Sequence, residues 1–202
     1  IAGGPNTDVV DYSSRIAAIT ADLNATTGFG EADENDTVAA DVEGVHGGAG
    51  DDVLTGDSGA NALRGNAGAD TIDPRLGSDD VTGGDGEDSV TYAGRTSGIT
   101  VRLDNSANDG QSGEADNVRN DVERLTGGAA SDRIYADDDP NVIVGGGGND
   151  TIYGYGGNDT ITGAAGNDSV WGGTGDDSLT AADGANKLYG EDGNDTLTTG
   201  AG

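Results

Sequence analysis

The sequence predicts an all-β parallel solenoid, and three observations support this prediction. A nine-residue pattern repeats through most of the chain, with Asp or Asn at one fixed place in every copy. Each copy has one regularly placed aliphatic residue between polar residues, which is typical of a short strand with a single inward side chain. Glycine accounts for 39 of 202 residues and aromatic residues for only 4%, so a thick core of large side chains is excluded.

The charge of the chain indicates which partners a compact form needs. Asp and Glu number 38 against 9 Lys and Arg, which gives a formal net charge of −29 at pH 7. Folding concentrates this charge and is opposed by self-repulsion unless cations bind. Nucleic acid and anionic lipid would be repelled, and no apolar run is long enough to span a membrane. Disorder is also compatible with this composition, and the order of the residues is what argues against it.

The repeat units follow one another without gaps in two long arrays. Five units occupy residues 47–91, eight occupy residues 127–198, and a single further unit occupies residues 3–11. Positions 1 and 4 are Gly in eleven of the fourteen units, and position 8 is aliphatic in all of them. Position 6 is always Asp or Asn, and these residues are the candidate metal ligands: Asp8, Asp52, Asn61, Asp70, Asp79, Asp88, Asp132, Asn141, Asp150, Asp159, Asp168, Asp177, Asn186 and Asp195.

Each unit can be interpreted as a tight turn followed by a short strand. Glycine permits left-handed backbone conformations and close approach in the turn, and positions 7–9 read as polar, aliphatic, polar. Two units would form one coil, with turns at both edges and two thin parallel sheets between them. One aliphatic side chain per unit contributes about 2 kcal/mol at best. Because this does not offset the ordering of each coil, bound ions must supply the difference.

Calcium fits the chemistry of these turns. Ca²⁺ binds six to eight oxygens and mixes carboxylates with backbone carbonyls. A glycine-rich turn exposes carbonyl groups, and the Asp at position 6 supplies a carboxylate. Because stacked turns repeat at the strand spacing of about 4.8 Å, an ion between them can bridge two aspartates that would otherwise repel each other. The absence of cysteine excludes disulfides and thiolate metal sites.

The units resemble the GGxGxDxUx nonapeptide of the RTX, or haemolysin-type calcium-binding, family. The resemblance implies a right-handed parallel β-roll or β-helix, type I secretion, and folding triggered by extracellular calcium. It also implies that each calcium ion lies between units k and k+2, bound by position-6 carboxylates and turn carbonyls. Counting such pairs gives about nine ions. We expect weaker sites around residues 136–144 and 181–189, where Asn141 and Asn186 lack a charge.

The two segments outside the arrays, residues 12–46 and 92–126, repeat each other at a constant offset without gaps. The recurring pairs include Tyr12/Tyr92, Arg15/Arg95, Ile19/Ile99, Leu23/Leu103, Asp36/Asp116, Asp41/Asp121 and Glu43/Glu123. Each segment is close to two coils in length, and alternating apolar residues predict a strand at 19–23 and at 99–103. We therefore expect wider, calcium-poor coils within one solenoid over residues 1–202. Two domains joined by flexible linkers are the alternative.

The acidic pairs in these segments, Asp41/Glu43 and Asp121/Glu123, could bind calcium, but we expect them to be solvated. Catalytic signatures are weak throughout. Gly56-Asp57-Ser58-Gly59 resembles the nucleophile signature of serine proteases, but it occupies positions 1–4 of a nonapeptide. The only histidine, His46, is expected in a turn, without the acid partner that a triad requires. We therefore expect no enzymatic activity in this chain.

Two ladders of side chains are expected on the outer faces. Tyr135, Tyr153, Trp171 and Tyr189 recur at position 9 of every second unit and should stack on one face. The opposite sheet should carry the pairs Thr160/Thr162, Ser178/Thr180 and Thr196/Thr198. Cross-strand pairing of good strand formers explains both ladders. The alternatives are a glycan or another surface protein on the aromatic ladder, and ice on the threonines.

Together these patterns predict a calcium-binding module of a secreted bacterial exoprotein or surface adhesin. An accessory module of a secreted enzyme is the alternative, with catalysis encoded elsewhere. The sequence begins at Ile1 and stops inside what resembles another repeat. We therefore expect it to be a fragment of a longer protein.

Overall fold

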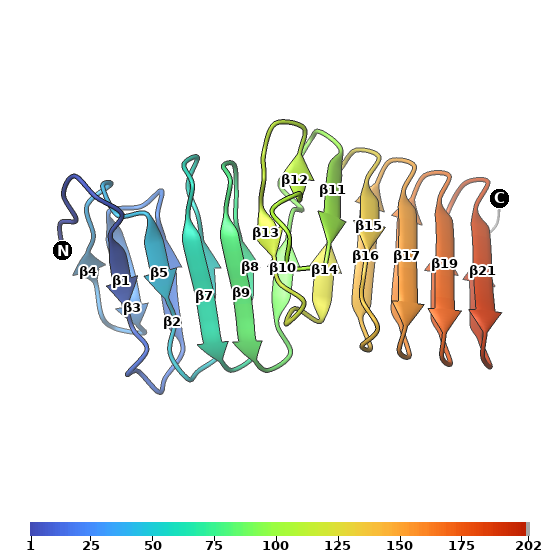
Figure 1. Cartoon of the computed structure of the whole chain (residues 1–202), viewed down its shortest axis with the longest axis horizontal. Coiled ribbons are helices and arrows are strands. Elements are labelled where there is room, and N and C mark those ends of the chain that lie inside the picture. The colour runs from blue at the N-terminus through green and yellow to red at the C-terminus, as the bar shows by residue number, and fades with distance from the viewer. Residues whose placement is uncertain (201–202) are drawn as a thin grey trace.

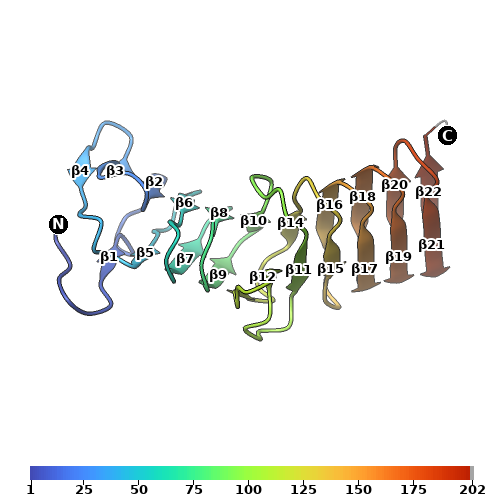
Figure 2. The same ribbon diagram turned by 90° about the horizontal axis from the view of Figure 1, so that it is seen from above.

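The molecule is built of stacked β-strands. The structure is a computed structural model that describes residues 1–200, and all regular elements in this part of the chain are strands. Figure 1 shows them side by side along the long axis, and Figure 2 shows that they form two opposite layers. Most neighbouring strands are parallel and offset by one coil. The predicted all-β class and parallel solenoid are confirmed.

One layer is a single sheet of eleven strands that runs through both arrays. Its strands, in spatial order, are β22 (Thr196–Thr199), β20 (Ser178–Ala181), β18 (Thr160–Ala165), β16 (Val142–Gly147), β14 (Arg124–Thr126), β10 (Ser89–Thr91), β8 (Thr71–Asp73), β6 (Val53–Thr55), β2 (Ile19–Asp22), β3 (Thr27–Glu31) and β4 (Asp36–Thr37). The two arrays therefore share one continuous ladder of backbone hydrogen bonds.

The opposite layer consists of two shorter sheets. The first contains β1 (Val9–Asp11), β5 (Gly44–His46), β7 (Ala62–Ala67), β9 (Asp80–Asp85) and β13 (Asn117–Val118). The second contains β12 (Gly110–Gln111), β11 (Ile99–Arg102), β15 (Arg133–Tyr135), β17 (Thr151–Gly156), β19 (Ser169–Thr174) and β21 (Lys187–Asp192). This layer is therefore interrupted at residues 92–126, whereas the eleven-stranded sheet is continuous there.

Successive nonapeptides alternate between the two layers, as the predicted two-unit coil requires. In the eleven-stranded sheet, Ile143 pairs with Ile161 and Ile161 with Leu179, each two units further along the chain. Several strands are longer than the three residues expected from positions 7–9. β17, for example, has six residues, and Tyr155 still pairs with Gly173. The ladder continues because the first three residues of the following unit stay in register before the chain turns.

The core is a single file of aliphatic side chains. Twelve of the fourteen position-8 residues are at most 3% exposed. Leu188 is only partly buried and Leu197 is 46% exposed; both lie in the last coil. Val45 and Leu125 extend the file through the segments outside the arrays. A core one side chain wide cannot by itself compensate for the ordering of so many glycines.

Each segment outside the arrays forms one wide coil, which corrects the expectation of nearly two coils. Ser89 pairs directly with Arg124, so 124 − 89 = 35 residues make one circuit. The extra residues double back as antiparallel strands: β3 on β2, β4 on β3, and β12 on β11. Glycines at positive φ, such as Gly30 at 106°, permit these reversals. The predicted strands at 19–23 and 99–103 are confirmed as β2 and β11.

Buried polar contacts explain why the wide coils repeat each other in sequence. The Tyr92 hydroxyl donates to Asp116 Oδ2 at 3.0 Å, and Arg95 forms a 2.9 Å ion pair with Glu114. The side chains of that ion pair are only 7% and 8% exposed. The equivalent contacts recur in the first wide coil, within residues 12–36. The wide coils are therefore held partly by their own side chains.

The predicted aromatic ladder is present on the outer face of the six-stranded sheet. Its rings stack in sequence, with centroid distances of 5.2 Å (Tyr135–Tyr153), 4.5 Å (Tyr153–Trp171) and 5.2 Å (Trp171–Tyr189). Interplanar angles are 15° or less. The Arg102 guanidinium lies 4.4 Å from the Tyr135 ring and ends the stack. On the opposite sheet the predicted threonine and serine pairs are in register.

Candidate metal sites

Most turns owe their shape to left-handed residues at positions 2 and 4; the first two units of each array have neither. In the unit 154–162, Tyr155 has φ 70° and Gly157 has φ 90°. A Cβ on the position-4 glycine of a following coil, Gly175, would collide with the carbonyl oxygen of Gly157. In turns of this kind glycine is therefore needed at position 4 both for its φ and for the close stacking of turns. Close stacking brings the carbonyl oxygens of neighbouring turns toward one another.

Position-6 residues of units k and k+2 are joined along both edges of the solenoid. The backbone N–H of each donates to the side-chain oxygen of the next, as when Asp132 N donates to Asp150 Oδ1 at 2.9 Å. Nine pairs share this contact at 2.7–3.0 Å: Asp52/Asp70, Asn61/Asp79, Asp70/Asp88, Asp132/Asp150, Asn141/Asp159, Asp150/Asp168, Asp159/Asp177, Asp168/Asn186 and Asp177/Asp195. The structure therefore brings the predicted residues together in the predicted pairs.

The second carboxylate oxygen of most of these aspartates is buried and has no hydrogen-bond partner. This holds for Oδ2 of Asp8, Asp70, Asp79, Asp88, Asp150, Asp159, Asp168 and Asp177. A buried carboxylate oxygen without a partner loses its hydration and gains nothing in return. Eight such atoms at the same position of eight units indicate a shared requirement for a bound cation.

A position-1 glycine leaves space beside seven of these eight oxygens; the exception is Asp79, whose unit begins with Pro74. A Cβ on Gly145 would lie 2.5 Å from Asp150 Oδ2 and 2.9 Å from the carbonyl oxygen of Gly163 in the next coil. Gly154 and Gly172 are bordered in the same way by their own aspartate and the next coil's carbonyl. Oxygens from a carboxylate and a carbonyl are the ligands that Ca²⁺ prefers, at about 2.3–2.6 Å. The donor set therefore fits calcium.

The electrostatics of these aspartates are unfavourable without a cation. Burial raises the pKa of Asp150 to about 7, and the charges of Asp132 and Asp168 on either side add to the rise. Burial likewise raises the pKa of Asp70, Asp79 and Asp159 to about 7. The cause is the cost of a buried negative charge next to like charges. A divalent ion between the coils would remove this cost.

The ligands come from two side chains and from backbone, not from a cluster of side chains. Within residues 1–200, no three His, Cys, Asp or Glu side chains converge to hold a metal. The first unit of each array also differs, because both carboxylate oxygens of Asp52 accept backbone N–H groups, from Ile19 and Gly48. Asp132 does the same with Ile99 and Gly128. These two aspartates need a cation less than the others.

Comparison with known families agrees with this geometry. The model of the RTX calcium-binding nonapeptide repeat (4 copies) matches residues 46–80, 55–90, 120–139, 135–170 and 171–202, which together are more than half of the chain. The chain belongs to the RTX calcium-binding repeat family. RTX repeats imply calcium binding, and the aspartate-rich turns described above fit it. No curated protein matches the chain.

Where the nonapeptide units of the RTX chain meet the wide coils, three acidic residues replace the position-6 aspartate as acceptor of the preceding aspartate's N–H. Glu43 accepts the N–H of Asp8, Glu123 that of Asp88, and Asp116 that of Asp79. The regular nonapeptide pattern does not include them. Reading the nonapeptide register one unit back from each array would have found Glu43 and Glu123 at position 6, since residues 38–46 and 118–126 also have an aliphatic residue at position 8.

Two other expectations were wrong. The acidic pairs are only partly solvated: Asp41 is exposed but accepts the N–H groups of Gly3 and Gly4, and Asp121 is partly buried and accepts that of Gly83. His46 lies in strand β5, paired with Asp11 and Arg64, and not in a turn. The second correction follows from the degenerate unit 38–46, whose positions 7–9 form strand β5.

A Cβ in the oxygen-lined space should remove one ion. We expect Gly145→Ala to bind one calcium fewer and to lose about 1–3 kcal/mol of unfolding free energy through overpacking. Urea unfolding at saturating calcium measures the second effect. Gly94→Ala is the control, because nothing lies within 4 Å of a Cβ at Gly94. Equal losses in both variants would contradict the assignment of the space to an ion.

Proposed function

We propose that this RTX chain is a non-enzymatic module of a secreted bacterial exoprotein or surface adhesin, and that it folds when it meets extracellular calcium. RTX repeats are typical of secreted bacterial proteins. The observation that carries the proposal is the row of eight buried, unpartnered aspartate oxygens at the coil edges. These atoms make the folded state dependent on cations, and their spacing repeats with every coil.

The charge of the chain supports the same mechanism. About nine divalent ions carry +18, which reduces the formal charge from −29 to about −11. Calcium sites of extracellular modules have dissociation constants of about 10⁻⁴–10⁻³ M. Such sites stay empty in calcium-poor cytoplasm and fill outside the cell, so the chain stays unfolded before export and folds after it. Folding then proceeds coil by coil, since each coil contacts only its neighbours.

The aromatic ladder has a structural explanation within this proposal. Its rings stack face to face, so the faces of Tyr153 and Trp171 are covered by their neighbours. Apolar ligands and sugar rings pack on aromatic faces. We therefore assign the ladder a structural role, which is to stabilise the register of the sheet as cross-strand aromatic pairs do. This role is favoured over glycan binding.

The number of bound ions tests the proposal. We expect native mass spectrometry in millimolar calcium to show at least about nine ions, one for each k to k+2 pair. Magnesium should bind far less, because it demands octahedral geometry at shorter distances and keeps its water. A chain that binds no calcium, or as much magnesium as calcium, would refute the proposed function.

A further inference from the structure

The junctions between the wide coils and the nonapeptides repeat the geometry of the RTX sites with different residues. We infer that each junction holds a further calcium ion: one bound by Asp88, Glu123 and the Asp121 carbonyl, the other by Asp8, Glu43 and the Asp41 carbonyl. We call these the seam sites. The inference rests on the proposed function, because it assumes that nonapeptide sites bind calcium. Glu43 lies outside the matched repeats.

The first argument is the unpartnered oxygen. Asp88 is fully buried, with 0% of its surface exposed, and its Oδ2 has no hydrogen-bond partner. Its Oδ1 accepts the Asp70 N–H, so only Oδ2 is free to bind an ion. At the other junction Asp8 is partly exposed, but its Oδ2 atom is buried and has no hydrogen-bond partner. Each seam therefore contains the same unsatisfied atom as a nonapeptide site.

The second argument is the space into which that oxygen points. A Cβ on Gly83 would lie 2.5 Å from Asp88 Oδ2 and 2.6 Å from the carbonyl oxygen of Asp121. The corresponding distances at the nonapeptide glycine Gly145 are 2.5 Å and 2.9 Å. The wide coil thus supplies a carbonyl at the place where the next nonapeptide would supply one. Gly3 has the same pair of neighbours, Asp8 Oδ2 and the Asp41 carbonyl.

The third argument is the second carboxylate. Glu123 Oε2 accepts the Asp88 N–H at 2.7 Å, as the position-6 aspartate of unit k+2 does within the arrays. Glu43 accepts the Asp8 N–H at 2.9 Å. Each seam then has two carboxylates and a carbonyl, like a nonapeptide site.

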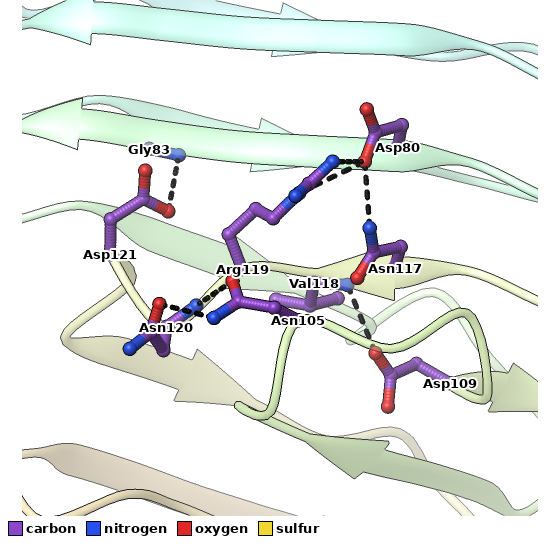
Figure 3. A network of polar contacts seen from close by, with 9 residues as sticks. All are labelled: Asp80, Gly83, Asn105, Asp109, Asn117, Val118, Arg119, Asn120 and Asp121. Atoms are coloured by element: carbon purple, nitrogen blue, oxygen red, sulfur yellow. Dashed lines mark hydrogen bonds and ion pairs between the residues drawn. The ribbon is translucent and has the colours of Figure 1, made fainter.

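Asp121 fixes this arrangement through its side chain. Figure 3 shows Asp121 reaching from the wide coil to the backbone nitrogen of Gly83 on the neighbouring strand. The hydrogen bond to Oδ1 is 3.1 Å long. It holds the Asp121 backbone against the glycine, which positions the carbonyl beside Asp88 Oδ2. Asp41 makes the same contact with Gly3 and also with Gly4. A bound ion at each seam would join a wide coil to its array.

Paired charge-neutral substitutions test the seam sites. In Glu43→Gln/Glu123→Gln, the amide oxygens can still accept the aspartate N–H groups, but the ligand charge is lost. We expect native mass spectrometry to count about two ions fewer than in the wild type, which would bind about eleven (nine plus two). The control is Glu87→Gln/Glu191→Gln, which removes two exposed glutamates and should leave the count unchanged.

The outcomes separate this inference from the proposed function. If the wild type binds no calcium, the proposed function fails. If the wild type and the double seam variant bind the same number of ions, the seam sites are refuted while the proposed function stands. If the double variant does not fold at saturating calcium, Glu43→Gln alone decides, since its strand partner β1 is an edge strand. Loss of one ion from that variant supports the inference, and an unchanged count overturns it.

Discussion

In a calcium chelator, this chain is expected to lose its β-structure completely. The core is one side chain wide, and eight buried aspartate oxygens have no partner without an ion. The free energy of ion binding is therefore folding free energy, as in small metal-dependent domains. Far-UV circular dichroism during a titration from chelator into millimolar calcium should show a cooperative change from a disordered to a β spectrum.

Magnesium at equal concentration is the control for ionic strength and divalent charge. It should not produce the β spectrum at the concentrations where calcium does. Proteolysis should report the same transition, because cleavage of an unfolded chain is rapid and stacked coils protect their backbone. A β spectrum that is unchanged by the chelator would show that the nonapeptides fold without an ion, against the central conclusion.

In the same chelator, acidification is expected to restore part of the folded state. The pKa values of Asp70, Asp79, Asp150 and Asp159 rise from 3.8 to about 7 in the ion-free fold, mainly through burial. Between pH 4 and 7 the folded chain therefore binds more protons than the unfolded chain. Stability falls as pH rises through this window and increases as pH is lowered, by roughly 1.4 kcal/mol per pH unit for each carboxyl.

A pH series from 7.5 to 5 in chelator measures this effect by circular dichroism and urea unfolding. Protons take the place of calcium by removing the charge from the buried carboxyls, so β-structure should increase toward pH 5. Asp150→Asn/Asp159→Asn is the matched variant, because an amide cannot titrate. The change of its unfolding free energy with pH should be smaller than in the wild type by the contribution of two carboxyl groups. A flat or opposite slope in the wild type would contradict the raised pKa values.

The repeating part of this structure was predictable because each position has a single physical requirement. Position 8 fills the core, position 4 needs glycine for its left-handed backbone, and position 6 pairs with its counterpart two units further on. The pairing of Asp150 with Asp168, the aromatic ladder and the layer alternation all follow from counting in nines. The nonapeptide sites are local in sequence and stack by translation, so period and position determine them.

The wide coils were less predictable because their contacts are not periodic in nine. Between β10 and β14 the chain doubles back on itself before it pairs again with β10. The Tyr92–Asp116 and Arg95–Glu114 contacts hold this segment in place. The recurrence of these residues in both wide coils indicated that they matter, but not what they contact. The role of Glu43 and Glu123 was not predicted because glutamate is absent from position 6 of the fourteen regular units, and only the backbone shows that the longer side chain reaches the same partner.

The alternation of units between layers limits how a module of this kind can grow. Whether a strand joins one layer or the other depends on whether an odd or even number of units precedes it. Insertion of one nonapeptide before Trp171 would transfer its strand to the eleven-stranded sheet and exchange the aromatic and threonine faces from that point on. The wide coil preserves this parity, since it leaves the eleven-stranded sheet at β10 and rejoins it at β14. Such a chain can lengthen by whole coils without changing either face, but not by halves.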